Sequence, residues 1–326
     1  MKVGNGYVLI SPCRDEADYM RQTLDSVVAQ SLRPAKWVII DDGSTDETPQ
    51  ILSEYASKHD WIEIVTRSDR GRRAVGPGVI DAFYAGFDTI DPDDFEYLCK
   101  LDLDLEIPPT YFERVISEME TSPRLANFSG KAYLREKDGR LTSERLGDEN
   151  AVGQIKFYRV TAFKEIGGFV RQVSWDGIDG HMCRMNGWIA RSEDKPELRF
   201  IHLRQMGSSQ HSLWVGRLRW GFGKYFMGSA VYYVAAVALY RMFEKPYVIG
   251  GWGILWGYLK AMTARAPRFE NREFRRFLRR FELQSLLFGK RRTVNRYHQK
   301  IRQSQQHVNA EIPGNSPDSF MGGNAE

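Results

Sequence analysis

The feature that most constrains the fold is a pair of short apolar runs separated by one amphipathic stretch near the start of the chain. Residues 7–11 read YVLIS and residues 37–40 read WVII. Between them, Leu24, Val27 and Val28 recur at helical spacing. Continuous apolar runs joined by a helix are typical of strands buried on both faces of a parallel sheet. The pattern predicts an α/β fold with a mostly parallel sheet.

Acidic residues follow two of the predicted strands. The second strand leads into DDGSTD at residues 41–46, and a later strand, residues 95–101, leads into Asp102 and Asp104. Ligands of open α/β sheets bind at the carboxyl ends of strands. Side chains alternate along a strand, so Asp102 and Asp104 are expected on one side, where two carboxylates can approach a hard cation that bridges a diphosphate.

Three motifs together resemble the family 2 glycosyltransferases of the GT-A fold: PCRDE at residues 12–16, DDGS at 41–44 and LDLD at 101–104, the last matching the DxD motif of that family. The resemblance covers roughly residues 1–210. It implies a Rossmann-like domain with a mixed, mostly parallel sheet. It also implies inverting, metal-dependent transfer of a sugar from a nucleotide-diphosphate sugar to a hydroxyl of a saccharide or polyprenyl-linked acceptor, as in bacterial envelope or exopolysaccharide synthesis.

The resemblance also implies roles for individual residues. Asp104 is expected to hold Mg²⁺ or Mn²⁺, and Asp102 to hold the donor ribose or the metal. Some GT-A enzymes use a late histidine as a further metal ligand; His202 stands in such a place, and a structural histidine is the alternative. The residues expected to contact the donor are Pro12, Arg14, Glu16, Asp41, Asp42, Arg72 and Arg73. The two arginines lie in a basic loop and suit bidentate phosphate binding, although a solvated turn is the other interpretation.

The segment WDGIDGH at residues 175–181 resembles the acceptor side of the family, where an acidic residue caps a helix and acts as the base. The usual Glu-Asp pair is absent. Asp179 is the preferred base and Asp176 the reserve, and either could simply be a helix N-cap.

Beyond residue 207 the composition changes. Residues 226–240 and 247–259 carry no charge, but each is shorter than the roughly 20 residues that a membrane-spanning helix needs. They contain tyrosines and tryptophans, and the basic segment 264–302 follows. We expect a helical region, residues 211–302, lying on an anionic membrane at the cytoplasmic face of the inner (plasma) membrane. A helical hairpin packed on the catalytic domain, or in a homodimer, is the alternative. Residues 303–326 are polar and predicted to be disordered.

Other features narrow the class of protein. The three cysteines show no short-range pairing, which argues against a disulfide framework or a zinc site. The polar start lacks a signal peptide pattern, so the catalytic region is expected in the cytosol. No motif of a nucleic-acid-binding fold accompanies the basic tail. A nucleotidylyltransferase would need a Gly-rich phosphate loop after the first strand, which is missing. A catalytically impaired sugar-nucleotide-binding or scaffold subunit stays open, because the Glu-Asp motif is altered.

Overall fold

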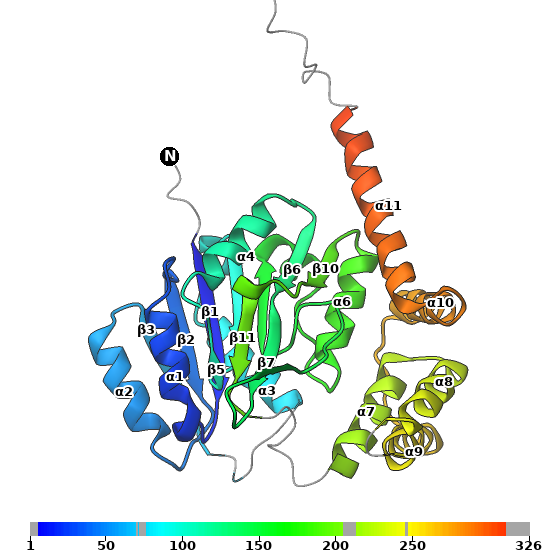
Figure 1. Cartoon of the computed structure of the whole chain (residues 1–326), viewed down its shortest axis with the longest axis horizontal. Coiled ribbons are helices and arrows are strands. Elements are labelled where there is room, and N and C mark those ends of the chain that lie inside the picture. The colour runs from blue at the N-terminus through cyan, green and yellow to red at the C-terminus, as the bar shows by residue number, and fades with distance from the viewer. Residues whose placement is uncertain (1–5, 70, 72–75, 205–212, 245–246, 311–326) are drawn as a thin grey trace, which may run out of the picture.

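The computed structural model describes residues 6–69, 71, 76–204, 213–244 and 247–310. An α/β domain is followed by a group of helices that lies along one side of it, next to α6 (Trp175–Met185) (Figure 1). The α/β domain is built from these elements: β1 (Tyr7–Cys13), α1 (Ala17–Val28), β2 (Lys36–Asp41), α2 (Thr48–Lys58), β3 (Ile62–Thr66), α3 (Pro77–Phe87), η1 (Pro92–Asp94), β4 (Tyr97–Leu101), β5 (Leu105–Glu106), α4 (Tyr111–Glu120), β6 (Leu125–Ser129), β7 (Lys131–Arg135), β8 (Leu141–Ser143), β9 (Ile155–Arg159), α5 (Val160–Glu165), α6, β10 (Ile189–Ser192), η2 (Pro196–Leu198) and β11 (Arg199–His202).

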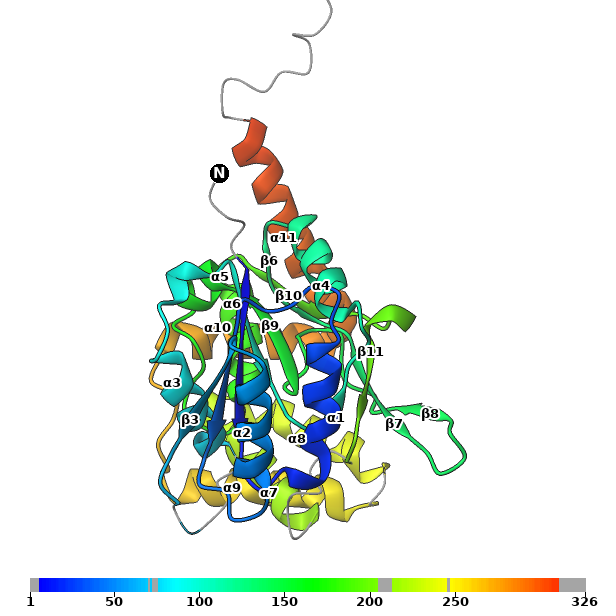
Figure 2. The same cartoon turned by 90° about the vertical axis from the view of Figure 1, so that its left-hand side faces the viewer.

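The main sheet has seven strands in the order β10-β6-β9-β4-β1-β2-β3. All neighbouring pairs are parallel except those that β9 makes with β4 and β6. A second sheet has the order β5-β11-β7-β8, and its β7–β8 hairpin projects from the body of the domain (Figure 2). The predicted mixed, mostly parallel α/β sheet is confirmed, whereas the second sheet was not foreseen.

The main sheet is buried on both faces, as its continuous apolar runs require. Along β1, Tyr7 and Leu9 belong to one core cluster, while Val8 and Ile10 belong to the other. The first cluster includes residues of α1, α2 and α4; the second includes residues of α3, α5 and α6. This two-sided burial fixes the register of the strands, and with it the positions of the polar residues at their carboxyl ends.

Two segments differ from the interpretation of the sequence, one in the sheet and one at the start of α6. The sequence predicts one strand over residues 126–133, but the structure breaks it at Gly130 into β6 and β7, which belong to different sheets. A Cβ atom at Gly130 would lie 1.6 Å from the Leu198 carbonyl oxygen, so only glycine allows this approach. The alternative interpretation of Asp176 or Asp179 as a helix N-cap is wrong, because α6 begins at Trp175 and Ser174 precedes it as N-cap.

The C-terminal helices are α7 (Leu213–Met227), α8 (Val231–Met242), α9 (Ile249–Thr263), α10 (Arg272–Phe288) and α11 (Lys290–Ala310). Helices α7 and α9 touch through glycines. A Cβ at Gly221 would lie 2.0 Å from the Ile254 carbonyl oxygen, and one at Gly257 would lie 2.2 Å from that of Leu218. Within the described residues, no helix combines the length and apolarity needed to cross a bilayer. Helix α11 includes residues 303–310, which the sequence assigned to a disordered tail.

Candidate functional site

The carboxyl ends of β1 and β2 form the part of the site assigned to the nucleotide. Arg14 is buried and donates to the Asp42 carbonyl at 3.0 Å and to Asp69 at 2.6 Å. The Asp41 carboxylate accepts from the Ser44 amide at 2.8 Å, which closes the turn after β2. A Cβ at Gly43, where φ is +77°, would lie 2.5 Å from the Asp69 Cα, so the turn after β2 packs directly on the backbone that follows β3. Pro12 lies within β1, paired with Ile40 of β2.

Asp104 lies just beyond β4, where two cationic side chains hold its carboxylate. His202 Nε2 is 3.3 Å and Arg204 Nε is 2.6 Å from Asp104 Oδ2, while Arg204 Nη2 donates to Glu16 at 2.8 Å. His202 Nδ1 is 3.0 Å from Glu144. Burial opposes the charged form of Asp104, but His202 and Arg204 outweigh it and hold the pKa of the carboxyl below its usual value. Burial likewise opposes a charged His202, yet Asp104 and Glu144 raise its pKa to about 9.

Asp102 is linked through a lysine to the acceptor side. Lys100 Nζ donates to Asp102 Oδ1 and, at 3.0 Å, to the Gly153 carbonyl. An added Cβ at Gly153 would lie 3.5 Å from Asp176 Oδ2. The Asp102 carboxylate and the start of α6 therefore meet around Lys100 and Gly153. Desolvation raises the pKa of Asp102, against the opposing effect of Lys100.

Asp179 is the centre of a buried polar network. Its carboxylate lies 2.5 Å from Lys156 Nζ and accepts from Tyr158 Oη at 2.6 Å and from Asn150 Nδ2 at 2.9 Å. The Asp179 side chain is 1% exposed and that of Lys156 is 0% exposed. A charged lysine inside β9 requires such a partner, because an unpaired buried charge is strongly unfavourable.

Asp176 lies one turn earlier on α6 and is exposed at the surface. The protein around its carboxyl limits hydration and raises its pKa; Lys156 acts against this rise and Asp179 adds to it. Helix α7 packs over the same end of α6, since a Cβ at Gly223 would lie 2.1 Å from Ser174 Oγ. Burial lowers the pKa of Arg219 on α7, and the nearby Asp176 opposes that change. Asp176 thus combines access, a raised pKa and a basic neighbour.

The residues around the DxD motif fit a divalent cation that is shared with a ligand. Among the described residues, no group of three or more His, Cys, Asp or Glu side chains is assembled for a metal. Asp104 Oδ1, however, is buried and has no hydrogen-bond partner in the described part of the chain. Mg²⁺-type ions commonly take one or two carboxylates and complete their shell with phosphate oxygens and water. Asp104, with Asp102 beside it, supplies such a partial set.

The structure brings together most of the residues that the sequence singled out. Arg14, Asp41 and Asp42 gather at one end of the site, and Glu16, Asp104 and His202 are joined through Arg204. Arg72 and Arg73 lie outside the described residues. Sequence reasoning missed three cations that organise the site: Lys100, Lys156 and Arg204. A lysine within each of the apolar strands YLCKL and IKFYR was the available signal, because buried lysines require acidic partners.

Comparison with known proteins gives a family match. The family model described as "Glycosyl transferase family 2" matches residues 8–182, more than half of the chain. A poly-β-1,6-N-acetyl-D-glucosamine synthase of Staphylococcus epidermidis is 27% identical over 133 residues, which are 40% of this chain and 30% of that protein. The synthase of Staphylococcus aureus strain MSSA476 is 25% identical over 133 residues, which again are 40% of this chain and 30% of that protein. The chain thus aligns with less than a third of these relatives' length.

Solved structures show likeness at the level of the fold. The structure of GalNAc-T7 with UDP, GalNAc and Mn²⁺ matches with a TM-score of 0.51 at 13% identity, covering 87% of this chain and 58% of that one. The mannosyltransferase PcManGT of Pyrobaculum calidifontis, in complex with GDP-Man and Mn²⁺, gives a TM-score of 0.49 at 15% identity, covering 95% and 88% of the two chains.

Proposed function

The chain belongs to glycosyl transferase family 2, and we propose that it transfers a sugar from a nucleotide-diphosphate sugar to a hydroxyl of a saccharide or polyprenyl-linked acceptor, with inversion at the anomeric carbon. One observation carries the proposal. Asp102, just beyond β4, and the exposed Asp176 of α6 meet around Lys100 and Gly153, and Asp104 follows Asp102 in the same motif. Transfer of this kind needs charge neutralisation at the diphosphate on one side and a base for the acceptor hydroxyl on the other.

We propose that Asp176 is the base and that Asp179 positions the helix, the reverse of the preference from sequence. Asp176 is open to solvent and has a raised pKa, which suits a group that must take a proton near neutral pH. Asp179 is enclosed by Lys156, Tyr158 and Asn150, so it has no room for an acceptor hydroxyl. The base assignment stays a prediction until the two variants are compared.

On the donor side, Asp104 is the proposed ligand of Mg²⁺ or Mn²⁺, and Asp102 would hold the metal or the donor ribose. The metal would neutralise the charge that develops on the leaving diphosphate. Arg204 and His202 hold Asp104 in its charged form, so the carboxylate is ready to exchange a cationic side chain for a metal ion. His202 then either stays as the partner of Asp104 or contributes Nε2 as a ligand. Arg14, Asp41 and Asp42 are proposed to contact the nucleoside.

Purified protein incubated with a panel of nucleotide sugars, with and without Mn²⁺, tests the reaction. Release of the nucleoside diphosphate from one donor, stimulated by the metal, is the expected result, and NMR of the glycosylated product reports the anomeric configuration. Donor binding without any release across the panel, even with acceptors present, would instead identify a sugar-nucleotide-binding or scaffold subunit. This second function is supported by the contacts of His202 and Arg204 with Asp104, because these side chains occupy a carboxylate oxygen that a metal would need.

We also propose that the C-terminal helices place the enzyme on an anionic membrane, at the cytoplasmic face of the plasma membrane. Large apolar side chains that are 47–75% exposed lie on α8, on α9 and between these two helices. This α8–α9 face comprises Val231, Tyr232, Leu239, Tyr240, Phe243, Tyr247, Val248, Ile249, Trp252 and Trp256. Tyrosine and tryptophan prefer the interface between water and lipid, and exposed arginines of α10 add attraction to acidic headgroups. Close glycine contacts between α7 and α9 are also common between helices in lipid.

A further inference from the structure

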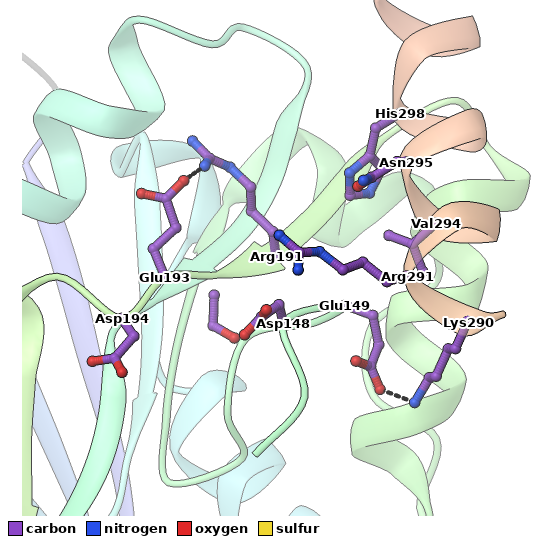
Figure 3. Close-up of a pocket in the computed structure, with 11 residues that line it drawn as sticks. Asp148, Glu149, Arg191, Glu193, Asp194, Lys290, Arg291, Val294, Asn295 and His298 are labelled. Carbon is purple, nitrogen blue, oxygen red and sulfur yellow. Dashed lines mark hydrogen bonds and ion pairs between the residues drawn. The ribbon is translucent and has the colours of Figure 1, made fainter. Parts of the chain in front are cut away.

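A cavity of about 470 Å³ lies between β10, at the edge of the main sheet, and the first turns of α11 (Figure 3). Its size is in the range of small-molecule sites. The loop residues Asp148 and Glu149 form part of its wall. Among the described residues that line it, Val294 alone has an apolar side chain, so the cavity is built for a polar ligand. None of them belongs to the proposed donor or base groups.

Each acidic side chain of the lining already forms an ion pair within the protein. Their cationic partners are Lys131 for Asp148, Lys290 for Glu149, Lys195 and Arg191 for Glu193, and Arg199 for Asp194. Arg291, by contrast, forms no ion pair with any residue in the described ranges. Figure 3 shows its side chain extending from α11 across the cavity toward Arg191. With the four lining carboxylates paired, Arg291 is a lining cation that no carboxylate of the described residues neutralises.

Buried polar atoms without partners occur in the lining, at His298, and beyond it, at Arg184. His298 lines the cavity, is 9% exposed, and its Nε2 has no hydrogen-bond partner in the described part of the chain. In Arg184 of α6, which is 4% exposed, Nε and Nη2 are in the same condition. Burial, followed by the charges of Arg184, Arg302 and Arg191, lowers the pKa of His298 to about 3, which places these cations around the imidazole. Leaving buried donors without acceptors is unfavourable, and an anion bound in the cavity could accept a hydrogen bond from His298.

The start of α11 adds a second electrostatic argument. Its first turn contains Lys290, Arg291 and Arg292 and no acidic residue. The N-terminal end of a helix carries a partial positive charge that normally favours carboxylates there. Three cations at this end are unfavourable beside the helix dipole, and an anion held by the two that line the cavity, Lys290 and Arg291, would relieve the repulsion.

We propose that this cavity binds a phosphate or diphosphate group, at a site separate from that of the sugar donor. Phosphate oxygens match several converging guanidinium and imidazole donors better than a single carboxylate does. The group belongs either to a small soluble ligand or to a lipid headgroup. Binding itself does not depend on the proposed reaction.

Calorimetric titration of the full chain with inorganic pyrophosphate, in the presence of a chelator, tests the site. Arg291→Gln removes a charge-assisted hydrogen bond and should weaken binding by roughly 10- to 100-fold. Arg292→Gln, the adjacent exposed arginine that does not line the cavity, is the matched control and should bind as the wild type does. In the NMR spectrum of ¹⁵N-labelled histidines, the His298 signal, assigned from His298→Gln, should move on titration.

A second arm replaces pyrophosphate with vesicles that contain phosphatidic acid and measures co-sedimentation of the same variants. A specific loss with Arg291→Gln in this arm alone assigns the phosphate group to a lipid headgroup, and a loss in the pyrophosphate arm assigns it to a soluble ligand. Binding that is equally strong in Arg291→Gln and Arg292→Gln in both arms, or an unmoved His298 signal, overturns the proposal. Neither readout requires turnover, so failure here is distinct from failure of the proposed glycosyl transfer.

Discussion

Lys156 of β9 and Asp179 of α6 form an ion pair of 2.5 Å in which both side chains are shielded from water. Tyr158 and Asn150 complete the hydrogen bonds of the carboxylate. A buried pair of this kind is weak evidence for net stabilisation, but removing one partner leaves an uncompensated charge. The stability of a protein that lacks one partner can therefore distinguish a structural role for Asp179 from a catalytic one.

Asp179→Asn should lower the free energy of unfolding by ~3–5 kcal/mol, because Lys156 would stay buried without a counter-charge. Urea denaturation measures the loss. The double variant Lys156→Gln/Asp179→Asn, which has no buried charge at this place, should recover part of it. An Asp179→Asn protein that is as stable as the wild type but inactive would instead support Asp179 as the base.

Asp176→Asn should lower kcat by about 10²–10⁴-fold, the usual contribution of a general base. The donor KM should change only a few-fold and the melting temperature little, because the side chain is exposed. The raised pKa also sets the pH dependence: the base works when deprotonated, so the acidic limb of kcat/KM should lie above the ordinary range of an aspartate. Steady-state kinetics between pH 4 and 9 check both points, and near-normal turnover by the variant would contradict them.

Asp104→Asn should abolish the stimulation of donor binding by Mn²⁺ and nearly all turnover, since an amide is a poorer ligand than a carboxylate for a hard cation. Calorimetry with the nucleotide sugar, with and without metal, measures the first effect. Asp93→Asn changes an aspartate that is exposed at the surface and paired only with Lys164 among the described residues, and it should leave both properties intact. Wild-type activity that persists in chelator would refute metal dependence.

His202 should make stability depend on pH in the absence of metal. Its folded pKa of about 9 lies above the reference value of 6.5. Its contribution is therefore fully present below about pH 6.5 and is lost as the pH rises through about 9, with an upper limit of ~3 kcal/mol. His202→Gln should accordingly be destabilised at pH 6 and nearly equal to the wild type at pH 9.5. Denaturation in chelator at the two pH values gives the comparison; an equal difference at both would show that the ion pair with Asp104 is not formed.

The α8–α9 face should bind vesicles that contain acidic lipids. Trp252→Gln/Trp256→Gln removes two exposed, stacked indoles and should reduce co-sedimentation strongly at both low and high salt, since apolar burial is not screened. Leu32→Gln, an exposed apolar residue of the α/β domain, is the control. High salt should weaken binding of the wild type without abolishing it, because only the arginine contribution is screened. A wild-type protein that stays in the supernatant at low salt would point to a packing or dimer interface.

The strand ends were predictable because each apolar run of the main sheet stops where the polar residues begin. Residues 37–40 and 95–101 located β2 and β4 to within about two residues, and with them Asp42 and Asp104. The break at Gly130 was not visible, since its cause is the approach of Leu198, which is distant in sequence.

The roles of Asp176 and Asp179 could not be read from the sequence either. A shift of one residue in the start of a helix turns every side chain by about 100°. The start of α6 depends on Ser174, which adopts a φ of +65°, a conformation that few non-glycine residues take and that sequence does not announce. Which carboxylate faces Lys156 and which faces solvent follows from this one turn.

The glycine contacts between α7 and α9 leave backbone against backbone, with no side chain between them to act as a cushion. Helix α7 carries Arg219 beside Asp176, and α9 carries Trp252 and Trp256 on the outer surface. The α7–α9 backbone contacts therefore link the surroundings of Asp176 directly to the exposed tryptophans of α9. If the proposed membrane face lies on a bilayer, this packing would hold Asp176, the proposed base, at a constant height above the lipid, and the length of the acceptor's anchor, as well as its chemistry, would select which hydroxyl is glycosylated.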